Sequence, residues 1–406
     1  MKHGTPVCRP VNGMMIIGSS GASKIANVLR APFIVHRTMK PPDSQAARSH
    51  NYLPGGTLYS MNYATTIPDP AGATHWIECN VEGATPPFTF ELIAGGRSNL
   101  TYQVIDANRN KYALRRPPAG HILPTAHNMA REYRVISALW PTMVPVARPL
   151  ALCEDTDVIG APFYMMSYLD GLVVRDGTGC KRALSHEARS QASRSMVATL
   201  ASLHRQDVDL LGLGDLGPKE AYIERQLKRW IGQYESSIQS IGKGYDQTDP
   251  VVAAHKMLCR SIPASQQVSL VHGDYRLDNL VVDQNGSVVG ILDWEICALG
   301  DPLADVGLLL VYWAEEEDES PLVEYPATAL DGFLSRRELT DLYMAESGLD
   351  LADIGYYMSF GYWKLACILS GVYARYISGA TGGDTTSVDR YATTITWLAH
   401  QALERL

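Results

Sequence analysis

One stretch constrains this chain more than any other: Val268–Glu295, in which short apolar runs alternate with polar segments. A first apolar run leads into the polar loop His272–Asn279, and a second apolar run leaves that loop. Asn285-Gly286 then separates two β-branched runs, which is a strong short-range signal for a β-hairpin. The last run, Val288–Leu292, ends next to an acidic residue. The stretch therefore predicts a loop and a hairpin whose polar residues meet at one end.

Three oxygen-bearing side chains of this stretch suit phosphoryl transfer. That reaction needs a carboxylate to orient and deprotonate an attacking hydroxyl, and hard oxygen ligands for Mg²⁺. Asp274 is the candidate catalytic base, and Asn279 and Asp293 are the candidate metal ligands. The simpler alternative is an ordinary hairpin with polar loop residues. We disfavour it because several spaced residues and their strand context agree with one motif.

These residues resemble the catalytic core of the aminoglycoside phosphotransferase and choline kinase-like family, distant relatives of protein kinases. The matching segments are His272-Gly273-Asp274, Asn279, and Leu292-Asp293-Trp294-Glu295. The resemblance implies ATP and Mg²⁺ as cofactors. It also implies an α+β, two-lobed protein-kinase-like fold. Its N-lobe would be a small antiparallel β-sheet with one helix, and its C-lobe would be larger and mainly helical.

Composition and pattern give the expected organisation of the 406 residues. Residues 1–60 show no sustained period and read as a disordered or weakly attached extension. The N-lobe would span residues 61–168 and the C-lobe residues 169–406. The net charge of −8 and the absence of a basic stripe argue against nucleic acid as a partner. Scattered cysteines and the lack of a long apolar run predict a cytoplasmic protein without a membrane span.

The N-lobe should begin its ordered part near Pro87, with three strands joined by turns. The first corner is rich in glycine, and it resembles the family's nucleotide-covering loop. Ser98 and Asn99 there match the branch found beside acyl-CoA dehydrogenase domains of the 10/11 type. Arg115 ends the third strand where protein kinases carry a lysine, and by resemblance it binds the nucleotide phosphates. The alternative is a solvated surface arginine.

Two further nucleotide contacts follow from the resemblance. A helix expected from about Ala126 to Leu139 carries Glu132, which would pair with Arg115; a solvated glutamate is the alternative. An apolar strand then ends at a hinge, where the Ser167 carbonyl and the Leu169 amide would bind the adenine edge.

The C-lobe contains charged groups with two interpretations each. Arg225, Lys228 and Arg229 lie on a helix expected to open at Pro218, and they either meet an anionic substrate or form a solvated face. The acidic run of residues 315–319 either holds a cationic aminoglycoside or is a solvated loop, and the solvated loop is favoured.

Two C-lobe features concern architecture and the acceptor. By resemblance, Asp305 supports the catalytic loop, and His204 is structural because it ends a packed helix. Seven aromatic residues between Tyr356 and Tyr376 suit an apolar or flat acceptor.

Together these features predict an ATP- and Mg²⁺-dependent phosphotransferase that acts on the hydroxyl group of a small molecule. The acyl-CoA dehydrogenase 10/11 branch suggests a hydroxyacyl or other apolar alcohol. One alternative is a nucleotide-binding pseudokinase or regulatory protein, because an arginine replaces the usual lysine. Another is an aminoglycoside-modifying kinase. A protein kinase is less favoured because no Asp-Phe-Gly or Ala-Pro-Glu segment bounds an activation loop.

Overall fold

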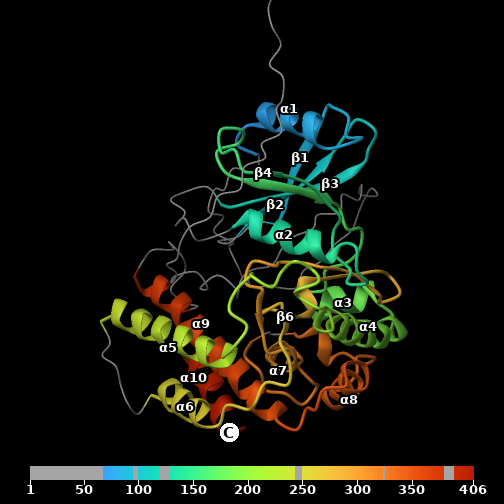
Figure 1. Cartoon of the computed structure of the whole chain (residues 1–406). Coiled ribbons are helices and arrows are strands. Elements are labelled where there is room, and N and C mark those ends of the chain that lie inside the picture. The colour runs from blue at the N-terminus through green and yellow to red at the C-terminus, as the bar shows by residue number, and fades with distance from the viewer. Residues whose placement is uncertain (1–66, 95–98, 119–127, 243–248, 323–324, 379–387) are drawn as a thin grey trace, which may run out of the picture.

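The computed structural model describes residues 67–94, 99–118, 128–242, 249–322, 325–378 and 388–406. The predicted extension of residues 1–60 and the predicted nucleotide-loop residue Ser98 lie outside these ranges. The described residues form two lobes, a sheet flanked by helices above a larger, mainly helical body (Figure 1). This is the two-lobed α+β fold predicted from the catalytic stretch.

The N-lobe is built on one antiparallel sheet of five strands in the order β1-β2-β3-β5-β4. The predicted meander and the predicted strand before the hinge are confirmed, with bounds that differ by a few residues, and a further strand, β4, lies at the edge of the sheet. The strands are β1 Thr89–Ala94, β2 Leu100–Ile105, β3 Lys111–Arg116, β4 Pro149–Cys153 and β5 Phe163–Ser167. Helix α2, Met129–Leu139, lies between the sheet and the C-lobe (Figure 1).

The N-lobe also contains a helix that was not expected, α1, Pro70–Asn80. Order was predicted to begin at Pro87, but an Asp-Pro start signal lies earlier in the chain. The Asp69 side chain accepts hydrogen bonds from the Ala71 and Gly72 amides, and proline is well suited to the first helical position. Ile77 is fully buried in the core of this lobe, so α1 is part of the packed structure.

The C-lobe contains most of the helices and two small strand pairs. Its helices are α3 Gly177–Ala183, α4 His186–His204, α5 Tyr222–Ser240, α6 Pro250–Arg260, α7 Leu303–Tyr312, α8 Arg336–Ser347, α9 Ile354–Ile377 and α10 Val388–Leu403. Its strands are β6 Ser269–Val271, β7 Leu280–Val282, β8 Val288–Ile291 and β9 Ala298–Gly300, and short 3-10 turns span Leu277–Asn279 and Ala327–Ala329. The predicted hairpin is confirmed as β7 paired with β8, and its turn uses Gly286 at a φ of 89°. Strand β6, which leads into the catalytic loop, pairs with β9.

Helix α5 begins later than the sequence suggested. Pro218 was expected to open it, but its first residue is Tyr222. The preceding residue, Ala221, has a φ of 50°, a left-handed conformation that cannot continue a helix.

Helix α9 runs through the middle of the C-lobe and packs against α5, α7 and α10 (Figure 1). Most of its aromatic side chains, including Tyr357, Phe360 and Trp363, are buried in the core. The indole N–H of Trp363 donates to the Val251 carbonyl at 2.9 Å. The aromatic density of this segment therefore serves packing, and it no longer supports an apolar or flat acceptor.

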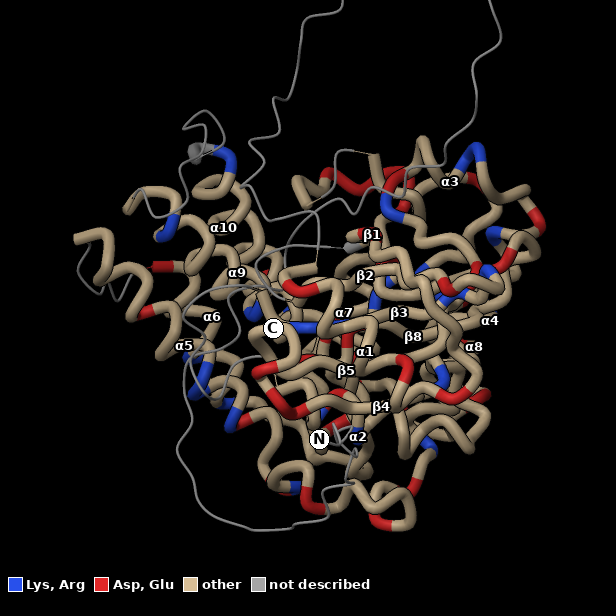
Figure 2. The backbone as a smooth tube through the Cα atoms, turned by 90° about the horizontal axis from the view of Figure 1, so that it is seen from above, with Lys and Arg blue, Asp and Glu red and all other residues tan. Residues whose placement is uncertain are grey.

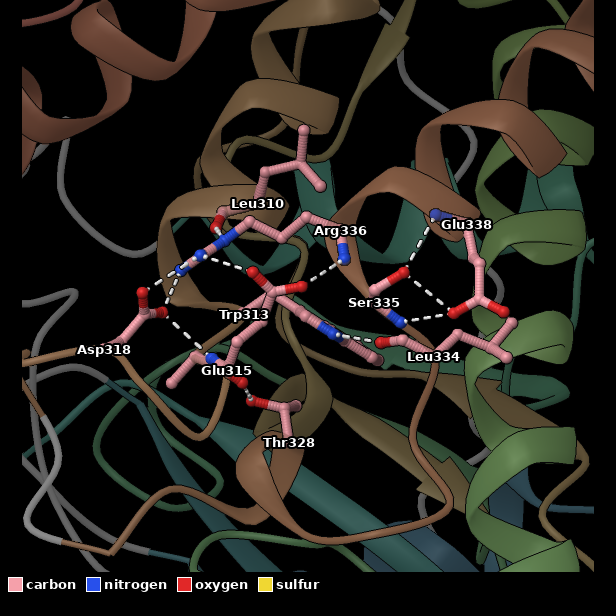
Figure 3. Close-up of polar contacts among 10 residues, drawn as sticks. Leu310, Trp313, Glu315, Asp318, Thr328, Leu334, Ser335, Arg336 and Glu338 are labelled. Carbon is pink, nitrogen blue, oxygen red and sulfur yellow. Dashed lines mark hydrogen bonds and ion pairs between the residues drawn. The ribbon is translucent and has the colours of Figure 1, made fainter.

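The acidic run of residues 315–319 is tied into the lobe by one arginine (Figure 3). Arg336, at the start of α8, donates to Glu315 at 3.1 Å and also pairs with Asp318. Ser335 and Glu338 cap the same helix end with a reciprocal capping box. Two of the five carboxylates thus hold the segment before α8, and Glu316, Glu317 and Glu319 are exposed. None of the described helices combines the length and the apolar composition that crossing a membrane requires.

Candidate active site

The loop His272–Asn279, predicted to be the catalytic loop, is held in place by a single buried carboxylate. Asp305, on α7, accepts hydrogen bonds from the His272 amide at 2.6 Å and the Gly273 amide at 2.7 Å. Gly273 has a φ of 86°, which a residue with a side chain would adopt only with strain. His204 contacts Asp305 at 3.2 Å and the Tyr343 hydroxyl at 2.7 Å. Asp305 therefore lies where the predicted support of the loop needs it, and His204 binds it from the end of α4.

Asp274 is a buried residue whose two carboxylate oxygens differ in their surroundings. The residue is 3% exposed, and the Asn279 side-chain N–H donates to its Oδ2 at 2.8 Å. Among the described residues, no group hydrogen-bonds to its buried Oδ1. Burial raises the pKa of Asp274 to about 6, against the opposing charge of Arg276. A carboxylate with this pKa is mostly ionised near neutral pH and can accept a proton.

Arg115 lies between two carboxylates that the sequence predicts to act at the nucleotide site, Glu132 and Asp293. Its Nε is 2.8 Å from Glu132 on α2, and its Nη2 is 2.5 Å from Asp293 after β8. The two carboxylates outweigh the effect of burial and raise the pKa of Arg115 further, so it is always charged. Asp293 has a φ of 63°, uncommon for a residue with a side chain and often found where function fixes the backbone. The structure thus pairs Arg115 with Glu132, as the family resemblance implies, and adds a direct contact of Arg115 with Asp293.

The other residues predicted to contact the nucleotide are Asn99, Ser167 and Leu169, and only Asn99 contacts the carboxylates described above. Asn99 is buried, and its amide N–H groups donate to Glu132 at 2.7 Å and to Glu295 at 3.3 Å. Its side chain therefore links two carboxylates. Ser167 exchanges hydrogen bonds with Arg148, and the Leu169 amide has no acceptor among the described residues. Their contacts with a nucleotide stay predictions.

Sequence reasoning did not single out Arg276, which lies beside the base. Its Nε is 3.5 Å from Asp274 Oδ2, its Nη2 is 2.8 Å from Asp278, and its guanidinium lies over the Tyr312 ring at 4.8 Å. Its place in the same loop, two residues after Asp274, was a usable signal. Glu295, in the Asp-Trp-Glu segment, is a second such residue, and its pKa is raised by burial and by neighbouring Asp293.

A cavity of about 320 Å³ opens beside the loop, between α2, α5 and α9. Gly273 and Glu295 connect it to the groups described above. Basic side chains contribute much of its polar wall: Arg131, Arg225, Arg229 and Lys364. Sequence analysis weighed Arg225 and Arg229 as anion contacts and missed Lys364, a lone lysine in the middle of an apolar helix.

The profile of the phosphotransferase enzyme family matches residues 89–339, which include every group placed around Asp274 apart from Lys364. The chain belongs to this family. The match confirms the resemblance drawn from the catalytic stretch, and it covers both lobes.

Individual relatives agree with this assignment. Mouse acyl-CoA dehydrogenase family member 10 is 33% identical over 312 residues, which is 74% of this chain and 28% of that protein. The chain thus spans well under half the length of the first curated relatives it matches. A crystal structure from Ralstonia eutropha JMP134, assigned as an aminoglycoside phosphotransferase, superposes with a TM-score of 0.67 at 29% identity, covering 83% of this chain and 98% of that one.

A more distant structure shares the fold and was determined with ligands. The amicoumacin kinase hAmiN, in complex with AMP-PNP, Ca²⁺ and its substrate, superposes with a TM-score of 0.53 at 17% identity, covering 82% of this chain and 93% of that one.

Proposed function

We propose that this protein is an ATP- and Mg²⁺-dependent kinase that transfers the γ-phosphoryl group to a hydroxyl group of a small molecule. The observation that carries the proposal is the unpartnered, buried Oδ1 of Asp274. A buried carboxylate oxygen without a donor is costly unless a ligand supplies one. An alcohol O–H is such a donor, and the pKa of about 6 suits proton removal near neutral pH.

The donor atoms present fit Mg²⁺ bound together with nucleotide phosphates. Among the described residues, no cluster of three His, Cys, Asp or Glu side chains forms a complete protein cage for a metal. Mg²⁺ is usually held by one or two carboxylates plus substrate phosphates, which is the set that Asp293 and Asn279 would complete. The main-chain hydrogen bond from the Leu292 amide to the Asn279 carbonyl keeps these two ligands near each other. Mg²⁺ would neutralise the phosphate charge that develops during transfer.

The protein's own groups would divide the remaining work. Arg115, positioned by Glu132, would hold the phosphates, and the hinge backbone at Ser167 and Leu169 would bind the base. Asp274 would orient the acceptor hydroxyl and take its proton, while Arg276 offers positive charge beside the reacting atoms. The AMP-PNP and Ca²⁺ bound by the amicoumacin kinase support nucleotide and divalent metal use in this fold.

The structure makes two alternative functions less favoured, a pseudokinase and an aminoglycoside-modifying kinase. A pseudokinase is disfavoured because the proposed metal ligand Asn279 hydrogen-bonds the proposed base Asp274, and the charge of Asp293 also acts on Asp274. An aminoglycoside acceptor is disfavoured because Arg336 already engages two carboxylates of the acidic run.

The test is phosphate transfer by the full chain with ATP and Mg²⁺ against a library of hydroxylated small molecules. Formation of ADP together with a phosphorylated product is expected. Asp274→Asn should reduce transfer by about a thousandfold while sparing nucleotide binding. Asp341→Asn, an exposed aspartate on α8, is the matched control and should retain full activity. A wild-type protein that binds ATP but phosphorylates no acceptor would contradict the proposal.

A further inference from the structure

Lys364 is a buried cation without a carboxylate partner. It lies in the middle of α9 and is 5% exposed. Its Nζ donates to the Gly273 carbonyl at 2.9 Å and lies 5.8 Å from the Trp230 ring centroid. Within the described residues, no carboxylate lies at ion-pairing distance from it. A buried ammonium group has three donors and is costly to leave without a negative partner, so two of its donors call for a ligand.

The other basic groups of the cavity are likewise not neutralised by ion pairs with described residues. Arg131 donates to the Cys297 carbonyl at 2.8 Å, and Arg225 donates to the Pro218 carbonyl at 2.7 Å. Arg229 faces the cavity from α5, a helix that carries several basic positions in Figure 2. Burial lowers the pKa of Lys364, and the charge of Arg229 adds to that effect against Asp274 and Asp305. Two cations that repel each other across a cavity form a site that an anion between them would stabilise.

The acidic groups of the cavity wall do not cancel this charge. Glu132 is bound by Arg115 at 2.8 Å, so its charge is already compensated. Glu295 accepts from Asn99 at 3.3 Å, and it is a single carboxylate facing the four basic side chains of the same wall. The cavity therefore keeps a positive balance and is poorly suited to a cationic acceptor.

The place of Lys364 also connects the cavity to the reaction. It binds the carbonyl of Gly273, the residue directly before the base Asp274. A group held by Lys364 would therefore lie near the loop that must receive the acceptor hydroxyl. Apolar residues such as Leu216, Ile296 and Leu299 also line the cavity, and they suit a short aliphatic chain that joins a group at Lys364 to a hydroxyl at Asp274.

We propose that Lys364 and Arg229 bind an anionic group of the acceptor, so that the substrate is a hydroxylated aliphatic carboxylate or phosphate monoester. This inference rests on the proposed kinase function and adds its substrate class. It also gives Arg229 the anion-binding interpretation over that of a solvated face. The acceptor would place its acidic group in the cavity and its hydroxyl at Asp274.

The experiment compares matched acceptors with the full-length protein, ATP and Mg²⁺. Short aliphatic hydroxy acids, phosphate monoesters of diols, and the methyl esters of the same acids are assayed for ADP formation and phosphorylated product. We expect kcat/KM for an anionic acceptor to exceed that for the matched ester by at least about tenfold. Comparing the acids with the phosphate monoesters tells which anion the site takes.

Single-residue variants test which side chains produce the preference for anionic acceptors. Lys364→Met and Arg229→Gln should each reduce the preference to within about threefold, mainly by raising KM, because the lost interaction is a binding contact. Lys364→Arg should restore part of the preference. Lys228→Met is the matched control, because Lys228 lies next to Arg229 on α5 and, unlike Arg229, does not line the cavity. Should Lys364→Met fail to fold, Arg229→Gln decides.

The outcomes separate the inference from the function on which it rests. Efficient phosphorylation of neutral or cationic alcohols, or a preference for anions that survives Arg229→Gln, overturns the anionic subsite and leaves the kinase function standing. ATP binding without transfer to any of the three acceptor classes or to a broader alcohol library overturns the kinase function itself.

Discussion

Arg115 and Lys364 are both buried cations beside the catalytic loop, yet the protein partners them in opposite ways. Arg115 contacts Glu132 at 2.8 Å and Asp293 at 2.5 Å, so two carboxylates fix its position. Lys364 has one carbonyl oxygen at 2.9 Å, and the described residues offer it no carboxylate. The first cation is held in place by a completed internal network, which positions it for the proposed phosphate contacts, and the second retains donors for a ligand. Burial alone therefore does not tell whether the protein itself supplies the counter-charges of a cation, whereas the count of carboxylate partners does.

Asp293 is expected to give the largest effect, because it serves both the Arg115 network and the proposed metal. Asp293→Ala should lower kcat by about a hundredfold to a thousandfold and weaken the dependence on Mg²⁺, since a metal ligand is lost. Steady-state turnover across a Mg²⁺ titration measures this. Unchanged Mg²⁺ dependence in the variant would place the metal elsewhere.

Arg115→Met tests the completed network through stability. Removing the cation leaves Glu132 buried without its counter-charge, and breaking a buried ion pair costs about 3 kcal/mol. Denaturant unfolding monitored by tryptophan fluorescence gives the free energy of unfolding. Lys111→Met, on the same strand, removes an exposed pair with Asp170 and should change that free energy by less than about 0.5 kcal/mol. Equal losses in the two variants would remove the distinction between them.

The pH profile tests Asp274, which directly follows Gly273, the residue whose carbonyl Lys364 binds. Its pKa is about 6, and the base acts only when ionised. The value of kcat/KM should therefore fall about tenfold per pH unit below pH 6 and reach a plateau above pH 7. A profile that stays level down to pH 5 would show that Asp274 does not take the proton.

Lys364→Met makes the same stability test on the second cation. Because a buried lysine without a counter-charge contributes little or nothing to folding, the free energy of unfolding should change by less than about 1 kcal/mol. The same denaturant measurement made for Arg115→Met applies. A loss comparable to that of Arg115→Met would mean that Lys364 is a structural cation after all.

The exposed part of the acidic run should give the smallest effect. Glu316→Gln and Glu317→Gln remove exposed charges that form no ion pair with the described residues, so turnover should change by less than about twofold. A large loss of activity would restore the interpretation of this run as a substrate site.

Local patterns explain which parts were predictable from sequence. The hairpin after the catalytic loop was predictable because Asn285-Gly286 and the flanking β-branched residues specify it within a short segment. Asp274 and Asn279 lie on that same loop, so their proximity is also local. Helix α1 was missed because its Asp69-Pro70 start precedes a short segment with little helical periodicity.

Groups from distant segments were harder to predict. The meeting of Arg115, Glu132 and Asp293 joins three elements. The family resemblance anticipated the pair of Arg115 and Glu132, but not the contact of Arg115 with Asp293. The aromatic residues of α9 were interpreted as substrate contacts because composition does not distinguish a buried face from a binding face. The same helix carried an unused signal in Lys364, because a lysine flanked by apolar residues needs a specific reason to be buried.

Asp305 joins the loop amides of His272 and Gly273 to His204 at the end of α4, which in turn contacts Tyr343 on α8. Three helices are thus anchored to the loop through one side chain with no exposed surface. The loop consequently has no means of loosening while the helices around it stay packed. Catalytic competence and the cooperative melting of the helical lobe should therefore disappear together on heating, without an inactive but folded intermediate.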